Sequence, residues 1–189
     1  MSAGNGVGSR PSWRPSLIVV GVLLVFTLGG WIVAAALAEP VGPPVGFQGV
    51  VTVQPLSGWQ FAGQREAAGA PLVRLTRGGG NLDIVAFSPL GEDSRTLAAR
   101  YVSSVLSTQL ERLSVSNRFT DVGLQDGTKG LRFTYVGVAG ETGQSIEGEV
   151  TVVFAPSGNA VVFDAWADEG LFAYAQGDLH TMIARAALS

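Results

Sequence analysis

Hydrophobic residues follow two different patterns along this chain, and the first is a continuous run. Leu17–Ala38 contains twenty-two residues and no charged side chain. At about 1.5 Å per residue, a helix of this length spans roughly 33 Å, enough to cross a hydrocarbon core of about 30 Å. Every backbone polar group inside lipid must be paired within the segment, as an α-helix allows. The run therefore predicts one transmembrane helix over residues 16–38.

Basic residues on the two sides of this run predict its orientation. Arg10 and Arg14 precede it, and the next basic residue is Arg65. By the positive-inside rule, residues 1–15 form a cytoplasmic tail, which its Gly-rich polar composition predicts to be disordered, and everything after Ala38 is extracytoplasmic. The alternative is a cleavable signal peptide, because Ala36–Ala38 matches an A-x-A cleavage site. Signal-peptide cores run about 7–15 residues, so we favour a retained signal-anchor in the cell membrane.

Small residues recur within the predicted span. Gly30, Ala34 and Ala38 are spaced four residues apart, a pattern that lets transmembrane helices approach closely. They are candidate helix-packing residues. Residues 39–46 are rich in proline and glycine and predict a semi-rigid, extended linker between the span and the following domain.

The second pattern is short-range alternation of apolar and polar residues, which is typical of β-strands with one buried face. Turn residues such as Gly78–Asn81 separate the alternating runs. The pattern predicts strands at Phe47–Gln54, Pro71–Arg77, Leu82–Ser88, Gly130–Val138, Ser145–Ala155 and Ala160–Ala167.

Two stretches have the spacing of amphipathic helices instead. Ser94 is a candidate cap for a helix that reaches Leu113, with apolar residues three or four positions apart. Asp178 is the candidate cap of a final helix, whose predicted packing face comprises Leu179, Met182, Ile183 and Ala186. The order of strands, helix, strands and helix predicts an α+β domain over residues 47–189, in which a mostly antiparallel sheet packs with two main helices.

This domain resembles the PsbP-like fold of photosystem extrinsic subunits and of LpqN-like mycobacterial envelope lipoproteins. The resemblance rests on the opening strand that leads into Pro55–Trp59, on the hairpin, on the Thr96–Leu113 helix, and on the meander with its closing helix. It implies a PsbP-like sandwich that serves as a small non-catalytic binding or accessory module. The chain departs from the lipoproteins because it lacks the anchoring cysteine and has an apolar run instead.

Charge and composition narrow the possible functions. The chain of 189 residues has a net charge of −3, and the part after Ala38 keeps all 15 acidic residues while losing two arginines, which leaves about −5. This balance argues against nucleic acid and against anionic lipid headgroups as partners. The chain has no cysteine, so packing must stabilise the domain. Arginine outnumbers lysine eleven to one, a bias that indicates an actinobacterial source.

No group of residues has the composition of a catalytic or metal site. His180 is the only histidine, and Asp178 two residues earlier supplies only half of a triad without a nucleophile motif. Asp164 with Asp168–Glu169 offers too few oxygens for calcium, and Glu147 and Glu149 share a strand face predicted to be solvated. We therefore expect a protein that is not an enzyme and has no cofactor.

A segment between the last strand and the last helix is the best candidate for partner binding. Most of the aromatic set, which comprises Trp59, Phe61, Trp166, Phe172 and Tyr174, is expected in the core. A loop cannot easily bury three large side chains, however, so Leu171, Phe172 and Tyr174 are predicted to be partly exposed partner contacts.

These patterns lead to one main functional hypothesis and two alternatives. The main hypothesis is a membrane-anchored envelope protein whose outer domain binds a protein partner as an accessory or scaffold subunit. The first alternative is a carrier of a small apolar ligand such as a lipid, which would need a continuous apolar cavity. The second is an envelope hydrolase, which lacks an evident nucleophile, base and metal ligands.

Overall fold

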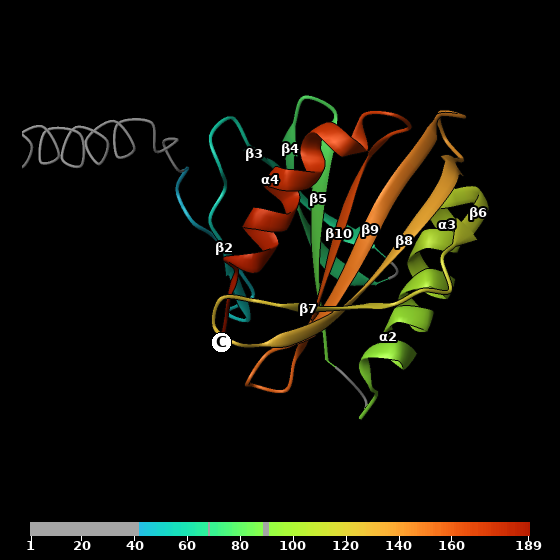
Figure 1. Cartoon of the computed structure of the whole chain (residues 1–189). Helices are drawn as coiled ribbons and strands as arrows, with labels where there is room; N and C mark the ends of the chain where they lie inside the picture. The colour runs from blue at the N-terminus through green and yellow to red at the C-terminus, as the bar shows by residue number, and fades with distance from the viewer. Residues whose placement is uncertain (1–41, 68, 89–90) are drawn as a thin grey trace, which may run out of the picture. The chain divides into compact units, whose positions relative to one another are not determined.

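A computed structural model describes residues 42–67, 69–88 and 91–189, which form an α+β domain built on two antiparallel sheets (Figure 1). The larger sheet has eight strands in the order β3-β4-β5-β10-β9-β8-β6, with β7 also paired to β8, and the smaller has the order β1-β2-β11. The strands are β1 (Val45–Phe47), β2 (Val51–Val53), β3 (Gln60–Ala67), β4 (Ala70–Arg77), β5 (Gly80–Phe87), β6 (Leu110–Val115), β7 (Thr120–Gly123), β8 (Lys129–Ala139), β9 (Ser145–Phe154), β10 (Ala160–Asp168) and β11 (Ala187–Leu188).

Helices cover both faces of the eight-stranded sheet. On one face lies a continuous helical segment made of α2 (Ser94–Tyr101), the π-helix η1 (Val102–Leu106) and α3 (Ser107–Gln109). On the other lies α4 (Phe172–Ala184), together with the three-stranded sheet. We call these the α2 face and the α4 face. The antiparallel sheet with two main helices that the sequence predicted is confirmed.

The central strands have apolar side chains on both faces because both faces are covered there. On β10, Val161 and Phe163 belong to the core under α4, whereas Val162 belongs to the core under α2. All three side chains are fully buried. Such strands appear in a sequence as nearly continuous apolar runs.

The start of the domain differs from the prediction. The strand expected at Phe47–Gln54 is a hairpin of β1 and β2, because Gln48 and Gly49 have positive φ angles of 52° and 66° and reverse the chain. The Gly42 N–H donates to the Pro55 carbonyl at 3.0 Å, and β1 begins at Val45. The last five residues of the linker predicted for residues 39–46 therefore already belong to the domain.

The first helix also differs from the prediction at both ends. Its N-cap is Asp93, whose side chain accepts a hydrogen bond from the Thr96 N–H at 2.7 Å, and not Ser94. It ends at Gln109, and Leu110 begins β6 by pairing with Ala139 of β8. The leucines up to Leu113 have helical spacing, so the sequence pattern did not reveal this strand. Pairing with β8 overrides the local helical propensity there.

Several strands and the start of the last helix were not recognised in the sequence. β3, β6, β7 and β11 carry many exposed residues and have weak alternation. The last helix begins at Phe172, and Asp178 lies inside it.

The predicted membrane segment is not part of this description. Among residues 42–67, 69–88 and 91–189, no helix has the length and apolar character required to cross a membrane. Leu17–Ala38, with the candidate packing residues Gly30, Ala34 and Ala38, lies outside the described residues.

Candidate functional site

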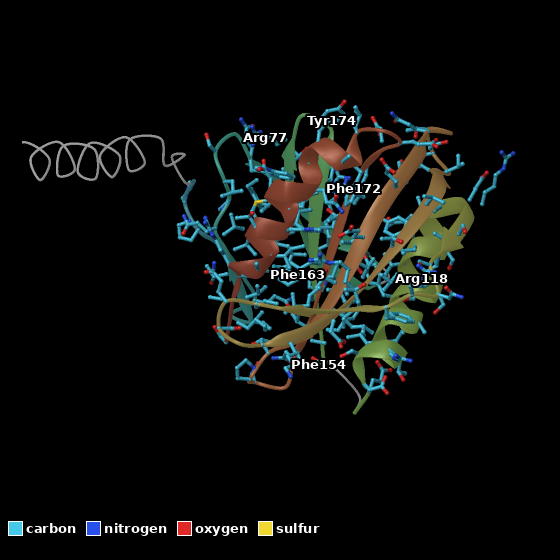
Figure 2. All side chains as sticks on the ribbon, in the orientation of Figure 1. Arg77, Arg118, Phe154, Phe163, Phe172 and Tyr174 are labelled. Atoms are coloured by element: carbon cyan, nitrogen blue, oxygen red, sulfur yellow. The ribbon has the colours of Figure 1, made fainter. Side chains whose placement is uncertain are left out.

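The segment predicted to contact a partner is split by the structure into exposed and buried residues. Tyr174 is 86% exposed and Leu171 is 43% exposed, as predicted, whereas Phe172 is only 7% exposed. The prediction for Phe172 was wrong because the segment is the first turn of α4 and not a loop, so the Phe172 side chain joins the core under the helix (Figure 2). We call the exposed pair, Leu171 and Tyr174, the α4 tip.

A carboxylate holds the beginning of α4 against the sheet. The Glu147 Oε1 atom accepts hydrogen bonds from the backbone N–H groups of Gly170 and Phe172, at 2.9 and 3.3 Å. The Phe172 N–H is among the groups that a helix start leaves without helical partners, and a negative charge there also interacts favourably with the helix dipole. Glu147 thus fixes the position of the α4 tip.

The turn between β4 and β5 supports the α4 tip from its other side. Gly80 is so close to α4 that an added Cβ would lie 2.7 Å from the Ala175 Cβ, and one on Gly79 would lie 3.6 Å from the Leu171 Cδ1. Further along the helix, the Asp178 Oδ2 accepts from Arg77 at 2.5 Å and from the Trp59 indole N–H at 3.0 Å. The two exposed side chains therefore stand on a braced helix end.

A groove of about 400 Å³ runs beside α4, where the helix leaves part of the sheet uncovered. Its floor includes Thr134 and Val136 of β8, and the Val136 side chain is 51% exposed. Ser114, Ser116, Glu147, Glu149, Phe172 and Gln176 also line it. The groove is open to solvent and mixes polar and apolar side chains.

Polar side chains link α4 to this part of the sheet. Glu149 accepts from the Gln176 side-chain amide at 2.6 Å, and its other oxygen lies 2.6 Å from the His180 Nε2. The same His180 nitrogen lies 3.0 Å from the Arg132 Nη1, and Arg132 also donates to Thr151 at 3.1 Å.

The sequence did not reveal this network, although it showed polar residues at alternating positions along β8 and β9. His180 and Asp178 do not act together, because Asp178 points to Trp59 and Arg77. Among the described residues, the partners of Asp178 and His180 are not those of a hydrolytic triad.

The α2 face holds a second polar cluster, and this one is closed to solvent. Asp164 accepts hydrogen bonds from the Tyr101 and Tyr135 hydroxyls at 2.8 and 2.7 Å. Burial, and then the nearby charge of Asp83, raise the pKa of Asp164 to about 7, although the two tyrosine hydrogen bonds act in the opposite direction. Burial also raises the pKa of both tyrosines, so both remain protonated donors.

Asp83 belongs to the same cluster and lies on β5, an interior strand of the sheet. Its two oxygens accept from Arg74 at 2.6 Å each, and Oδ2 also accepts from the Trp166 indole at 3.1 Å. Arg74 lies over the Trp166 ring, 4.9 Å from its centre. These partners satisfy the buried carboxylates internally, so the cluster holds the fold together.

The acidic residues weighed as metal ligands do not come together. Asp164 is buried within β10, whereas Asp168 ends that strand and Glu169 is exposed in the turn that follows. Within residues 42–67, 69–88 and 91–189, no group of three histidine or acidic side chains has the arrangement of a metal site.

Comparison with solved structures identifies the fold. The cyanobacterial PsbP (CyanoP) from Synechocystis sp. PCC 6803 matches with a TM-score of 0.58 and 13% identity, over 81% of this chain and 94% of that chain. A Bacteroides thetaiotaomicron protein matches with a TM-score of 0.50 and 12% identity, and 78% of this chain corresponds to 48% of that one. The Saccharomyces cerevisiae Ran-binding protein Mog1p has a TM-score of 0.49 and 12% identity, over 79% and 96% of the two chains.

The likeness to the cyanobacterial PsbP establishes a PsbP-like α+β fold for the domain. No protein-family model and no curated protein matches the sequence.

Proposed function

We propose that this chain is a single-pass membrane-anchored envelope protein whose extracytoplasmic domain binds a protein partner through the α4 tip. The observation that carries the proposal is the 86% exposure of Tyr174 beside Leu171, on a helix end braced by the sheet and by a turn. A rigid support matters because little conformational freedom is lost when such side chains bind. Aromatic residues are also the commonest contributors to binding energy at protein interfaces.

The proposed role is that of an accessory or scaffold subunit of a membrane complex. In keeping with this, the contacts of Glu149, Asp83 and Asp164 described above are internal and structural. The groove beside α4 adjoins the α4 tip through Phe172, and it would extend the contact area of a partner.

A carrier of a small apolar ligand is less well supported. Such a function needs an enclosed apolar cavity that covers most of the ligand. The groove beside α4 and a second hollow of about 470 Å³, which Arg100 and Ser104 help to line, are both open to solvent and partly polar. These features favour a protein partner.

The membrane anchor is proposed from the sequence, and its orientation can be tested. Arg10 and Arg14 are the only basic residues before the apolar run, so replacing both with Glu should scramble the orientation of the chain. A reporter fused after Ser189 would then lose export. Export of the reporter at the wild-type level would contradict the proposed orientation.

Retention of the anchor is tested by the N-terminus of the mature protein. A signal-anchor keeps the full-length protein in the membrane fraction. A soluble species that begins at Glu39 would show cleavage after Ala38 and a secreted domain.

The binding surface is tested by a double variant, Leu171→Ser with Tyr174→Ser. Both side chains are exposed, so the domain should remain folded while recovery of the partner from mild detergent falls. Phe61→Ser is the matched control, because Phe61 is 52% exposed on the edge strand β3. Unchanged recovery with the double variant would refute the α4 tip as the binding surface.

A further inference from the structure

The groove beside α4 places an exposed apolar side chain next to a carboxylate. Val136 of β8 is 51% exposed and pairs across the sheet with Glu147 of β9. Residues paired in this way point to the same face, with Cβ atoms about 4.5–5.5 Å apart. This part of the sheet is open because α4 lies over β5 and β10, with β8 beside it (Figure 1). The floor of the groove is therefore apolar at one point and acidic at the next.

Two hydrogen-bond acceptors of the groove have no partner among the described residues. The Glu147 Oε1 accepts from the backbone at the beginning of α4, whereas its Oε2 forms no hydrogen bond or ion pair with the described part of the chain. Gln176 donates its amide N–H to Glu149, and its side-chain oxygen likewise has no partner among these residues. Both Glu147 and Gln176 line the groove. The groove therefore suits a group that donates hydrogen bonds.

The groove also has excess negative charge. Glu147 and Glu149 line it, and none of the described residues that line it is basic. Arg132 lies 3.6 Å from the Glu149 Oε2 and balances that carboxylate, but Glu147 has no such counter-charge in the described chain. Glu169 adds a carboxylate nearby, because its N–H donates to the carbonyl of Ser145, two positions before Glu147. A cationic occupant would complement this charge.

We propose that the groove binds a lysine or arginine side chain of the protein partner. This inference rests on the proposed function, since it describes the chemistry of the partner named there. Lysine and arginine have an apolar stem and a cationic head that donates but does not accept hydrogen bonds. The stem packs on Val136, and the head donates to the free oxygens of Glu147 and Gln176.

The position of the groove favours a protein over a free small cation as the source of this group. The groove is open to solvent, whereas sites for small ligands cover most of the ligand surface. Phe172 and Gln176 line the groove and belong to the same helix as Tyr174. One partner surface can therefore contact the Tyr174 ring and place a basic side chain in the groove.

The first experiment measures recovery of the partner by the full-length protein in mild detergent. Glu147→Gln keeps an oxygen for the α4 N–H groups and removes the charge, so recovery at low salt should fall about tenfold. The difference from the wild type should shrink at high salt, because salt screens the ion pair. Val136→Thr keeps the β-branched shape, removes apolar surface and should also lower recovery. Glu141→Gln is the matched control, because Glu141 is exposed in the β8–β9 turn and does not line the groove.

The second experiment tests the ion pair by charge exchange. p-Benzoylphenylalanine in place of Val136 crosslinks the full-length protein in intact cells, and the crosslinked segment of the partner should contain a lysine or arginine. Replacing that residue with glutamate, or Glu147→Lys alone, should reduce recovery, and combining the two should restore at least half of it. Urea unfolding checks that each variant is folded. No adduct, an adduct without a basic residue, an adduct to a second copy of this chain, or no rescue between folded proteins would each overturn the inference.

Failure of this inference can be distinguished from failure of the proposed function. If the Leu171→Ser and Tyr174→Ser double variant loses the partner while Glu147→Gln and Val136→Thr retain it fully, the groove does not bind the partner but the proposed function stands. If none of these variants changes recovery, both fail. Calorimetric titration with spermidine tests a free polyamine as occupant, and we expect no binding at micromolar concentrations. Binding that Glu147→Gln abolishes would overturn the assignment to a protein side chain.

Discussion

The polar side chains on the two faces of the eight-stranded sheet differ in their exposure to solvent. On the α2 face, Asp164 is fully enclosed, and the hydroxyls of Tyr101 and Tyr135 satisfy its oxygens. On the α4 face, α4 leaves the β8 side uncovered, so polar residues such as Thr134 remain open to solvent. A covered face must pair its polar groups internally, because an unpaired buried polar group is costly. An uncovered face keeps its side chains available to a partner.

A glycine shows how closely the covered face is fitted. An added Cβ on Gly148 would lie 2.6 Å from the Tyr135 Cζ and 2.8 Å from the Ala165 carbonyl. Tyr135 therefore crosses β9 over this glycine to reach Asp164 on β10. At the α4 tip the helix end is also closely fitted, but the Tyr174 side chain itself is almost fully exposed. We therefore expect substitutions of buried residues to change the stability of the domain, and substitutions at the α4 tip to change partner binding.

The largest expected loss of stability comes from Phe172→Ser. The ring is 7% exposed in the core beneath α4, and removing a buried aromatic side chain costs about 3–5 kcal/mol. Thermal or urea unfolding of the purified domain would measure this loss. A change below about 1 kcal/mol would show that the beginning of α4 does not pack as described.

The buried carboxylate on the α2 face should make stability depend on pH. With a pKa near 7 in the folded state and 3.8 as its ordinary value, Asp164 keeps a proton between about pH 4 and pH 7 that the unfolded chain releases. Its contribution to the free energy of unfolding is complete below pH 4 and is lost as the pH rises through 7. The expected decrease is on the order of 4 kcal/mol, at about 1.4 kcal/mol per unit.

This pH dependence is measured by urea unfolding between pH 4 and pH 8. Asp164→Asn keeps the shape of the side chain and removes the ionisable group, so its profile should be flatter than that of the wild type. Identical profiles for the two proteins would assign the pH dependence to other groups.

An intermediate effect is expected from Gly148→Ala. The added methyl group would collide with the Tyr135 ring and with a backbone carbonyl that cannot move freely. Overpacking of this kind costs about 1–3 kcal/mol. Combining it with Tyr135→Leu, which removes both the Cζ and the hydroxyl, tests the cause, because a steric conflict with that side chain makes the two changes non-additive.

The smallest effect on stability is expected from Tyr174→Ser. An exposed side chain without structural contacts changes the unfolding free energy by no more than about 0.5 kcal/mol. Comparison of its unfolding free energy with that of Phe172→Ser separates the effect of an exposed side chain from the effect of a buried one in the same helical turn. A loss of 2 kcal/mol or more would place Tyr174 in the packing of the domain.

The sequence alone determined the class of the domain and its central strands. Alternation over Gly130–Val138 correctly located β8, whose buried and exposed residues largely alternate, and the pattern over Ser145–Ala155 correctly located β9, although most of that strand is buried on both faces. The pattern also placed Glu147 and Glu149 on one strand face, but the prediction that this face is solvated was wrong for Glu149, which is buried and paired with Gln176 and His180 of α4. Exposure of Leu171 and Tyr174 was predicted correctly, although the loop expected there is the first turn of α4.

At positions where local sequence preference and long-range pairing disagree, the tertiary structure determined the outcome. Leu110 has helical spacing but pairs with Ala139. Phe172 was expected in a loop but begins a helix, and its N–H donates to Glu147. Glu147 lies 25 positions before Phe172, so no local pattern could reveal this contact. Long-range contacts also bring together Tyr101, Tyr135 and Asp164, which come from three separate elements. The pKa of Asp164 depends on how completely these elements exclude water.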